Sequence, residues 1–329
     1  MKSPDPSRRR AGLIYDLVNR VIVFFLLVVL TFALPRLMPG DPLSLLLSSD
    51  VTRELTAAEA EALRQDMGLG GSWADQFLTY CRAVLSGDLG YSFHHAAPVS
   101  QLLATALPWT GLLVLGAIPL YLIVGVLAGI EAGRVPHRRF DRIATGAMTV
   151  LASLPPFTVA VFLLLIFAVL WPVLPLGGAQ PIFPAEAPLA RSVEILRHAL
   201  LPTVALAVHE IVRFYLLSRG EAVALSARPF LINARARGIS GWRERIDYYG
   251  RNLLPVILAR MSDSITVLIG AVLYVEVVFS YPGIGHLNLG AIMDRDYTLL
   301  QGAVLGLSVL VLSLNWLIDV AAALLARRG

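Results

Sequence analysis

The segment PFLINARARGISGWRERIDYYGRNLLP, residues 229–255, carries five arginines between two long apolar runs. The chain around it is strongly apolar. Of its 329 residues, 57% are hydrophobic and only 15% are charged, and the mean hydropathy is +0.70. Soluble proteins carry about 25% charged residues. Because a charged side chain is costly at the centre of a bilayer, this segment is expected at a membrane surface, with its apolar neighbours in the lipid.

Six apolar blocks in the sequence are long enough to cross a bilayer, which takes roughly 20 residues per helix. Lipid offers no water to the backbone N–H and C=O groups, so each block is expected to be helical. The sequence therefore predicts an all-α membrane protein with six transmembrane helices. The third block contains Pro155 and Pro156 and is expected to kink there. The blocks cover residues 17–37, 108–130, 143–174, 199–218, 256–280 and 300–325.

The placement of arginines predicts the orientation of these helices. Arginines gather before the first block, between the second and third, between the fourth and fifth, and at the chain end. With six crossings these four segments share one side, which the positive-inside rule makes cytoplasmic. Both termini are thus expected inside the cell. The predicted division is a cytoplasmic N-terminus at 1–16, a first transmembrane helix at 17–37, an extracytoplasmic helical cap at 38–107, and a membrane core at 108–329 with a cytoplasmic loop at about 219–255.

The first block and the outer segment behind it each carry a local signal. The first block ends in Pro-Arg-Leu-Met-Pro rather than in small residues, so we expect a retained helix and not a cleaved signal peptide. Thr56 and Glu59 have the spacing of a capping box. The stretch WADQFLTYCRAVLSGDLG then predicts a helix with one apolar face. That face consists of Phe77, Leu78, Cys81, Val84 and Leu85. The single cysteine, Cys81, allows no intrachain disulfide framework.

Within the arginine-rich segment, the sequence predicts a short helix with defined ends. Pro229 suits the first helical position, and Gly238 suits a C-terminal cap. Ala234 and Ala236 are small, so such a helix is able to enter a groove on another protein. The commoner use of clustered juxtamembrane arginines is contact with anionic lipid headgroups. Charge alone favours the lipid interpretation over a protein contact.

The motifs FLINARARGIS and RNLLPVI resemble the cytoplasmic loop of the permease subunits of bacterial ABC importers. More narrowly, they resemble the dipeptide/oligopeptide/nickel permease family. In this sequence Phe230 replaces the usual tyrosine, Ile232-Asn233 an Arg-Thr pair, and Arg237 a lysine. Five further motifs are similar to motifs of this family and occur in the same order along the chain: LMPGDP (37–42), GDLGYSF (87–93), SLPPF (153–157), GAVLYVEVVFSYPGIGHL (270–287) and AIMDRDYTLLQG (291–302).

The resemblance implies the translocation subunit of an ATP-driven importer in the bacterial inner membrane, working by alternating access. It implies four kinds of partner: a homologous second permease subunit, two ATP-binding cassette subunits, an extracytoplasmic solute-binding protein and the lipid bilayer. The outer segment would help to receive the binding protein. ATP and Mg²⁺ would act on the ATPase subunits, and no cofactor is expected in this chain. The loop would form the coupling helix that docks on the ATPase, through Phe230, Asn233, Ala234, Arg235, Ala236, Arg237 and Gly238. Di- or oligopeptides are the expected cargo, with nickel or another small solute as the alternative.

Ionisable residues also occur within or near the predicted spans, where they usually face protein or water. His209, Glu210 and Arg213 lie near the inner end of the fourth span. They form either a polar patch on the translocation path or a structural ion pair, since Glu210 and Arg213 are spaced i, i+3. The sequence leaves these two readings open.

A second group of candidate residues lies in the fifth span and the turn after it. Glu276 precedes a turn containing Pro282 and Gly283, which should form a constrained loop beside the path. Glu276 would either accept backbone N–H bonds from that loop or line the path, and the structural role is slightly favoured. Asp263 is a weaker candidate of the same kind.

Other protein classes fit the sequence less well. Bilayer-length apolar runs argue against a nucleic-acid-binding protein. A secondary transporter should show internal repeats and paired broken helices, and the sequence shows neither. The sequence has no G-x-x-x-x-G-K-[ST], G-x-S-x-G or H-E-x-x-H motif, so neither ATP hydrolysis nor intramembrane proteolysis is expected. Adjacent His94 and His95 should point apart in a strand or a loop, and no cysteine or carboxylate cluster nearby completes a metal site.

Overall fold

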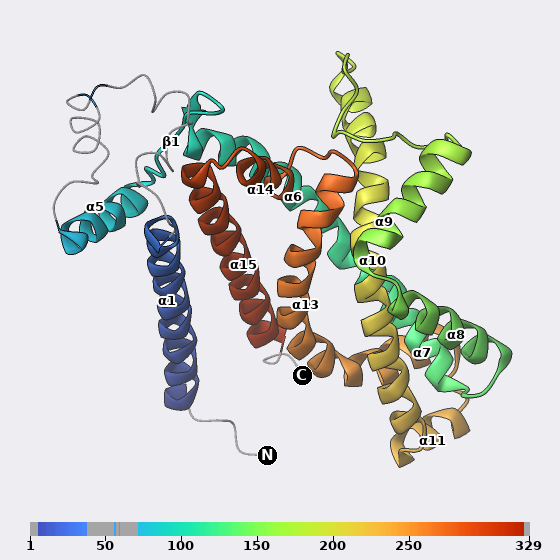
Figure 1. The fold of residues 1–329 in the computed structure, drawn as a ribbon. Coiled ribbons are helices and arrows are strands. Elements are labelled where there is room, and N and C mark those ends of the chain that lie inside the picture. Colours follow the sequence, from blue (N-terminus) through green and yellow to red (C-terminus); the bar gives the residue numbers. More distant parts are fainter. Residues whose placement is uncertain (1–5, 38–55, 57–58, 60–71, 326–329) are drawn as a thin grey trace. The chain divides into compact units, whose positions relative to one another are not determined.

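The computed structural model describes residues 6–37, 56, 59 and 72–325. Within these residues the chain is helical, apart from connecting segments and one hairpin of two short strands (Figure 1). The chain divides into two compact units, Met1–Leu107 with Leu287–Ser313 and Pro108–His286 with Leu314–Gly329. Helices α6 (Val99–Tyr121), α14 (Ile284–Met293) and α15 (Tyr297–Leu325) each contribute residues to both units.

The first unit contains a helix and a hairpin that follow the first apolar block. Phe32 of α1 packs against Phe77 and Tyr80 of α5, with ring centroids 5.1 and 5.7 Å apart. Strands β1 and β2 pair antiparallel. The elements of this unit are α1 (Pro6–Leu37), α5 (Trp73–Ser86), β1 (Tyr91–Ser92), β2 (Ala97–Pro98) and parts of α6 (Val99–Tyr121), α14 (Ile284–Met293) and α15 (Tyr297–Leu325).

The capping box predicted in the outer segment is confirmed. The hydroxyl and backbone N–H of Thr56 both donate to the Glu59 carboxylate, at 2.6 and 2.8 Å, and the Glu59 N–H donates back to the hydroxyl at 3.4 Å. The hydroxyl contact holds the pKa of Glu59 below its ordinary value. Helix α5 begins with a second capping box, Ser72 with Asp75. The predicted apolar face of α5 is correct for Phe77, but Leu85 is 84% exposed.

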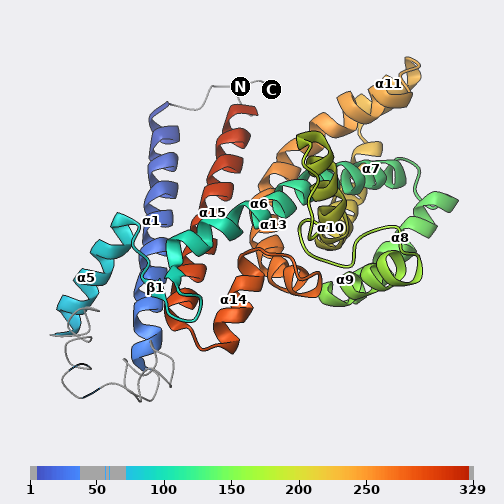
Figure 2. The same ribbon diagram turned by 90° about the horizontal axis from the view of Figure 1, so that it is seen from above.

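The second unit is built around α10, a helix of 39 residues. Its most extensive contact is with α7 (Leu127–Arg134), which lies alongside it (Figure 1 and Figure 2). Gly125, Gly129 and Gly133 recur every fourth residue, and a Cβ on any of them would collide with the α10 backbone. The glycines thus let α7 lie directly against α10. The elements of the unit are the rest of α6, η1 (Leu122–Val126), α7 (Leu127–Arg134), α8 (Arg139–Ser153), α9 (Pro156–Leu164), η2 (Leu165–Leu170), α10 (Pro188–Ser226), α11 (Pro229–Ala236), α12 (Gly241–Arg243), η3 (Glu244–Gly250), α13 (Arg251–Val278) and parts of α14 and α15.

Four helices among the described residues are long and apolar enough to cross a membrane. A fifth candidate is α8 with α9 and η2, which are bent by 105° at Leu154-Pro155. The kink predicted at the two prolines is confirmed, and it is sharper than a tilt. Helix α1 contains a shorter apolar run, Val18–Ala33. The chain is therefore a multi-pass helical protein with four or up to five such helices, and the count of six with both termini inside stays a prediction. The four helices are Val99–Arg134, Pro188–Ser226, Gly241–Val278 and Tyr297–Val320.

Candidate functional site

The predicted short helix in the arginine-rich segment is present as α11, and it has the predicted ends. Pro229 occupies its first turn. Gly238 has φ +78°, a left-handed conformation that favours glycine. The N–H of Gly238 donates to the Arg235 carbonyl at 2.9 Å, and that of Ile239 donates to the Ala234 carbonyl at 3.1 Å. These bonds satisfy carbonyls that the end of the helix would otherwise leave without partners.

Helix α11 has one face against its own chain and one face open. Leu231 is fully buried and Ala234 is 3% exposed, so these two residues hold the helix on the protein. Of the seven residues predicted to dock a partner, Ala234 thus lies on the packed face. Apart from Arg235, which is exposed but also contacts its own chain, the exposed residues within 230–238 are Phe230, Ile232, Asn233, Ala236, Arg237 and Gly238. A surface of apolar, small and basic side chains is suited to a shallow groove on another protein.

Arg235, also predicted to dock, binds within the chain and still has a side chain that is 39% exposed. Its Nε donates to Glu244 Oε1 at 2.8 Å, and Nη2 donates to the Tyr249 hydroxyl at 2.8 Å. The other Glu244 oxygen lies 3.4 Å from Arg134 Nη1 of α7. The Glu244 side chain is 4% exposed, so these two guanidinium groups compensate for the hydration that burial removes.

A second contact joins the same loop to α7. Arg245 donates to Glu131 Oε2 at 2.8 Å through Nε and lies 2.7 Å from it through Nη2. The Arg245 guanidinium also lies over the Trp242 ring, 5.7 Å from its centroid. Together with the Tyr249 hydroxyl, which lies 2.7 Å from the Ser226 hydroxyl of α10, these contacts fix the loop on α7 and α10. Sequence analysis missed this network. The one available signal was a single acid, Glu244, flanked by arginines.

The preceding arginine-rich loop, between α7 and α8, is held in a similar way. Asp141 at the start of α8 accepts from Arg219 of α10, at 2.5 Å from Nε and 2.9 Å from Nη2. It also accepts the His137 backbone N–H at 2.8 Å. Asp141 is only 2% exposed, so this pair is a structural link between α8 and α10.

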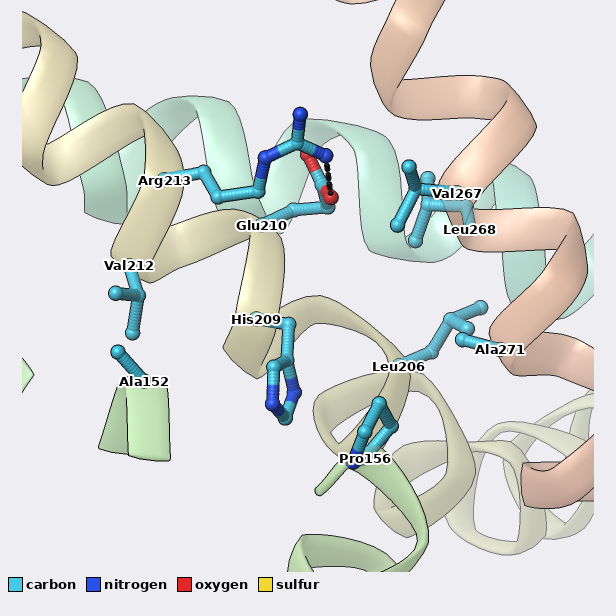
Figure 3. Close-up of a pocket in the computed structure, with 10 residues that line it drawn as sticks. All are labelled: Ala152, Pro156, Leu206, His209, Glu210, Val212, Arg213, Val267, Leu268 and Ala271. Atoms are coloured by element: carbon cyan, nitrogen blue, oxygen red, sulfur yellow. Dashed lines mark hydrogen bonds and ion pairs between the residues drawn. The ribbon is translucent and has the colours of Figure 1, made fainter. Parts of the chain in front are cut away.

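The structure brings His209, Glu210 and Arg213 together beside a cavity of about 260 Å³ between α8, α9, α10 and α13 (Figure 3). Glu210 is 1% exposed. It accepts from Arg213 Nη1 at 2.8 Å and from the Ser264 hydroxyl of α13. His209 Nε2 donates to the Leu154 carbonyl at 2.7 Å. The i, i+3 ion pair is therefore real, and it borders a cavity large enough to hold several atoms of a ligand.

At this cavity, His209 and Arg213 each have hydrogen-bonding capacity that the described residues do not use. His209 Nδ1 is buried without a hydrogen-bond partner within the part of the chain that the structure describes. The Arg213 side chain is 32% exposed and uses Nη1 for Glu210. The remaining cavity wall is mostly apolar, formed by Ala152, Pro156, Leu206, Val212, Val267, Leu268 and Ala271.

Asp263 is not part of this cluster. It lies on an exposed face of α13, 3.1 Å from Arg260 Nη1 on the same helix. Their side chains are 63% and 49% exposed. The arrangement gives Asp263 no role in the cavity.

Glu276 fastens the loop that follows α13. It accepts from the Thr110 hydroxyl at 2.6 Å, from the Gly285 N–H at 2.6 Å and from the His286 N–H at 3.3 Å. A Cβ on Gly283 would collide with its carboxylate. Pro282, between α13 and α14, is exposed. This geometry is the structural role that the sequence slightly favoured.

His94 and His95 lie closer together than the sequence suggested. Their ring centroids are 5.5 Å apart, because both lie in the turn between β1 and β2 and not in an extended strand. The expectation that they point apart is therefore wrong. His94 Nε2 lies 3.2 Å from an Asp294 carboxylate oxygen. Among the described residues, no group of three or more His, Cys, Asp or Glu side chains could hold a metal ion.

Comparisons with known proteins agree with the resemblance in the sequence. A family model described as binding-protein-dependent transport system inner membrane component matches residues 122–328. A relative from Brucella abortus, named for a peptide transport system permease protein, is 30% identical over 91% of this chain and 92% of its own length. A "probable peptide ABC transporter permease protein" from Sinorhizobium fredii is 31% identical over 95% and 96%. A nickel import system permease protein from Staphylococcus aureus is 28% identical over 95% and 90%.

Proposed function

The chain belongs to the family of binding-protein-dependent transport system inner membrane components, and from that premise we propose that it imports di- or oligopeptides as one half of a two-subunit membrane path. It is a multi-pass protein of the bacterial inner membrane. In the proposed assembly it has six membrane-crossing helices and both termini in the cytoplasm. It pairs with a homologous second permease, and an extracytoplasmic binding protein delivers the cargo.

The open face of α11 is the surface through which ATP hydrolysis is coupled to transport in this proposal. Two ATP-binding cassette subunits hydrolyse ATP with Mg²⁺ at the cytoplasmic side, and α11 docks one of them. The docking residues are those on the open face, with Phe230 and Arg237 at either end. Ala234 and Arg235, which contact their own chain, position the helix instead. Alternating access then requires that closure of the ATPase pair favour a different packing of the membrane helices.

Co-purification tests this docking. The chain would be isolated from its native membrane in mild detergent, and every associated protein identified. Wild type should bring down an ATPase and a second permease. Gly238→Asp and Arg237→Glu should lose the ATPase, because one strains the left-handed cap and the other reverses an exposed charge on α11. Arg138→Glu, an equal reversal at an exposed arginine of another loop, should retain it. A chain that purifies alone would point to a gradient-driven carrier.

Nickel is the second candidate cargo, because a relative named for nickel import is nearly as similar as the peptide permeases. The co-purified binding protein distinguishes the two. It would be titrated with a labelled peptide library and, separately, with Ni²⁺. Peptide binding supports the first proposal, and binding of Ni²⁺ alone overturns it in favour of the second.

The cavity beside His209 and Arg213 is the proposed polar position on the translocation path. Its support is a membrane-embedded cavity bordered by an open histidine nitrogen and a partly exposed guanidinium. Glu210, buried and bonded to two partners, orients Arg213. Val267→Trp should fill the cavity and abolish peptide uptake. Tyr274→Trp, at an exposed position on the same helix and outside the cavity lining, should not. Equal uptake by both variants would make the ion pair purely structural.

A further inference from the structure

Glu244 occupies an unusual position for an acidic residue. It lies between two arginines in the sequence, yet both of those have other partners. Arg245 binds Glu131, and Arg243 lies 3.8 Å from Asp247 on an exposed surface. Glu244 is instead buried, 3% exposed. A buried carboxylate is costly unless cations and hydrogen bonds compensate for its lost hydration. Its conformation is therefore determined by the two arginines that reach it, Arg235 and Arg134.

Those two arginines come from separate helices. Arg235 lies in the last turn of α11, and Arg134 is the last residue of α7. Glu244 itself is the first residue of η3. Arg235 extends the contact to Tyr249, which meets Ser226 near the end of α10. Glu244 is thus the point at which α11, η3 and α7 meet, and the same cluster reaches α10.

Helix α11 has little else to fix its orientation. It has only eight residues, and isolated helices shorter than about 12–15 residues are marginal in water. Two of its residues, Leu231 and Ala234, are buried. One apolar contact patch allows the helix to pivot. A second attachment through Arg235, at the far end from Pro229, removes that freedom.

From this geometry we propose that Glu244 is a positioning residue, which locks α11 to α7 and α10 so that a displacement of α11 moves those helices as one body. The inference rests on the proposed docking of an ATPase by α11. Without Glu244, Arg235 loses its carboxylate partner, and α11 pivots on Leu231 and Ala234. Docking then continues, but the movement is absorbed within the loop and does not reach the membrane helices.

A set of matched variants tests this role in the assembled, reconstituted transporter. Glu244→Gln and Arg235→Gln remove the two sides of the contact, and the double variant removes both. Arg243→Gln removes an exposed arginine from the same loop and serves as the control. The measurements are ATPase co-purification, the melting temperature, and peptide uptake per ATP hydrolysed.

We expect Glu244→Gln to retain the ATPase while uptake per ATP falls by about 2- to 30-fold, the range for a coupling contact. The double variant should be no worse than the more affected single variant, because the two residues act through one contact. Arg243→Gln should resemble wild type. Uptake per ATP equal to that of the control would overturn the proposal. A wild-type chain that brings down no ATPase would instead contradict the proposed function.

Spin labels give a second measurement, which does not depend on how stable the Glu244 variant is in activity assays. Ser240→Cys, just after α11, and Ile123→Cys, on η1, would be labelled in a Cys81→Ser background within the whole complex. The proposal expects one narrow distance, unchanged between the nucleotide-free and ATP-bound states, that broadens when Glu244→Gln is added. A wild-type distance that shifts with ATP would show that α11 moves independently of α7, and the proposal would fail.

Discussion

Substitution of Gly129 by alanine should separate α7 from α10, and its effect is predictable in size. A Cβ at this position would lie 2.6 Å from the Tyr215 carbonyl oxygen and 2.8 Å from the Ser218 Cβ. Both obstacles are part of the α10 backbone or attached directly to it, so a side-chain rotation does not relieve them. Gly220 on α10 is the matched control, because a Cβ there meets nothing within 4 Å.

Both substitutions gain the stability of alanine over glycine in a helix, but only Gly129→Ala also introduces a steric clash. Replacing a helical glycine by alanine gains roughly 0.5–1 kcal/mol at either site. Overpacking a close contact costs about 1–3 kcal/mol, and it applies to Gly129→Ala alone. The difference in free energy of unfolding between the variants should therefore be about 1–3 kcal/mol.

Thermal unfolding of the detergent-solubilised chain, followed by size-exclusion chromatography, measures this difference. Each kcal/mol shifts Tm by roughly 2–4 °C in domains of 150–250 residues, so Gly129→Ala should melt roughly 2–12 °C below Gly220→Ala. Because α7 also carries the residues that hold the coupling loop, uptake should fall as well. If Gly129→Ala melts at or above the Tm of the control, the direct helix contact is not what the glycines provide.

Three other substitutions test separate contacts. Glu276→Gln leaves one oxygen to accept from the Gly285 and His286 N–H groups and turns an amide NH2 toward the Thr110 hydroxyl, which loses its acceptor. The free energy of unfolding should fall by about 1–3 kcal/mol, seen as a lower Tm; an unchanged Tm would contradict the loop-fastening role. Asp141→Asn should leave Arg219 without its charge partner. The free energy of unfolding should fall by about 3 kcal/mol, the lower end for breaking a buried ion pair, and proteolysis between α7 and α8 should be faster. Proteolysis at the wild-type rate would count against the link. Ser72→Ala should cost about 0.5–2 kcal/mol and increase hydrogen exchange in α5 while leaving α10 unchanged; equal exchange in α5 would mean that the cap is not needed.

Four of the six apolar blocks lie in helices long enough to cross a membrane, but the blocks did not predict the lengths of those helices. The block at 199–218 became α10, which runs from Pro188 to Ser226. Its polar ends extend beyond the apolar run, so the hydropathy of the sequence does not predict where the helix ends. Tertiary contacts such as that of Ser226 with Tyr249 decide the helix end. The two prolines predicted a kink because proline removes a backbone donor, but the bend of 105° depends on packing around it.

The residues at its two ends predicted the helix α11, but its contacts with the rest of the chain could be seen only in the folded structure. Proline at the start and glycine after the end act within the helix itself, so Pro229 and Gly238 were readable from sequence. The partner of Arg235 is nine residues away in another element, and Arg134 reaches the same carboxylate from a distant part of the sequence. Sequence spacing on one helix predicted the Glu210–Arg213 pair, but it gave no indication of the Ser264 contact or of the cavity.

Site-specific photo-crosslinking in cells tests the central claim, that the open face of α11 docks the ATPase. Benzoylphenylalanine would replace Phe230, an aromatic residue that is 40% exposed on α11, and in a parallel strain Leu85, which is 84% exposed on α5 in the predicted outer segment. We expect a crosslink from position 230 to a protein with ATP-binding motifs and none to it from position 85. An intact complex that gives no such crosslink from position 230, or gives it equally from position 85, would show that α11 does not dock the ATPase.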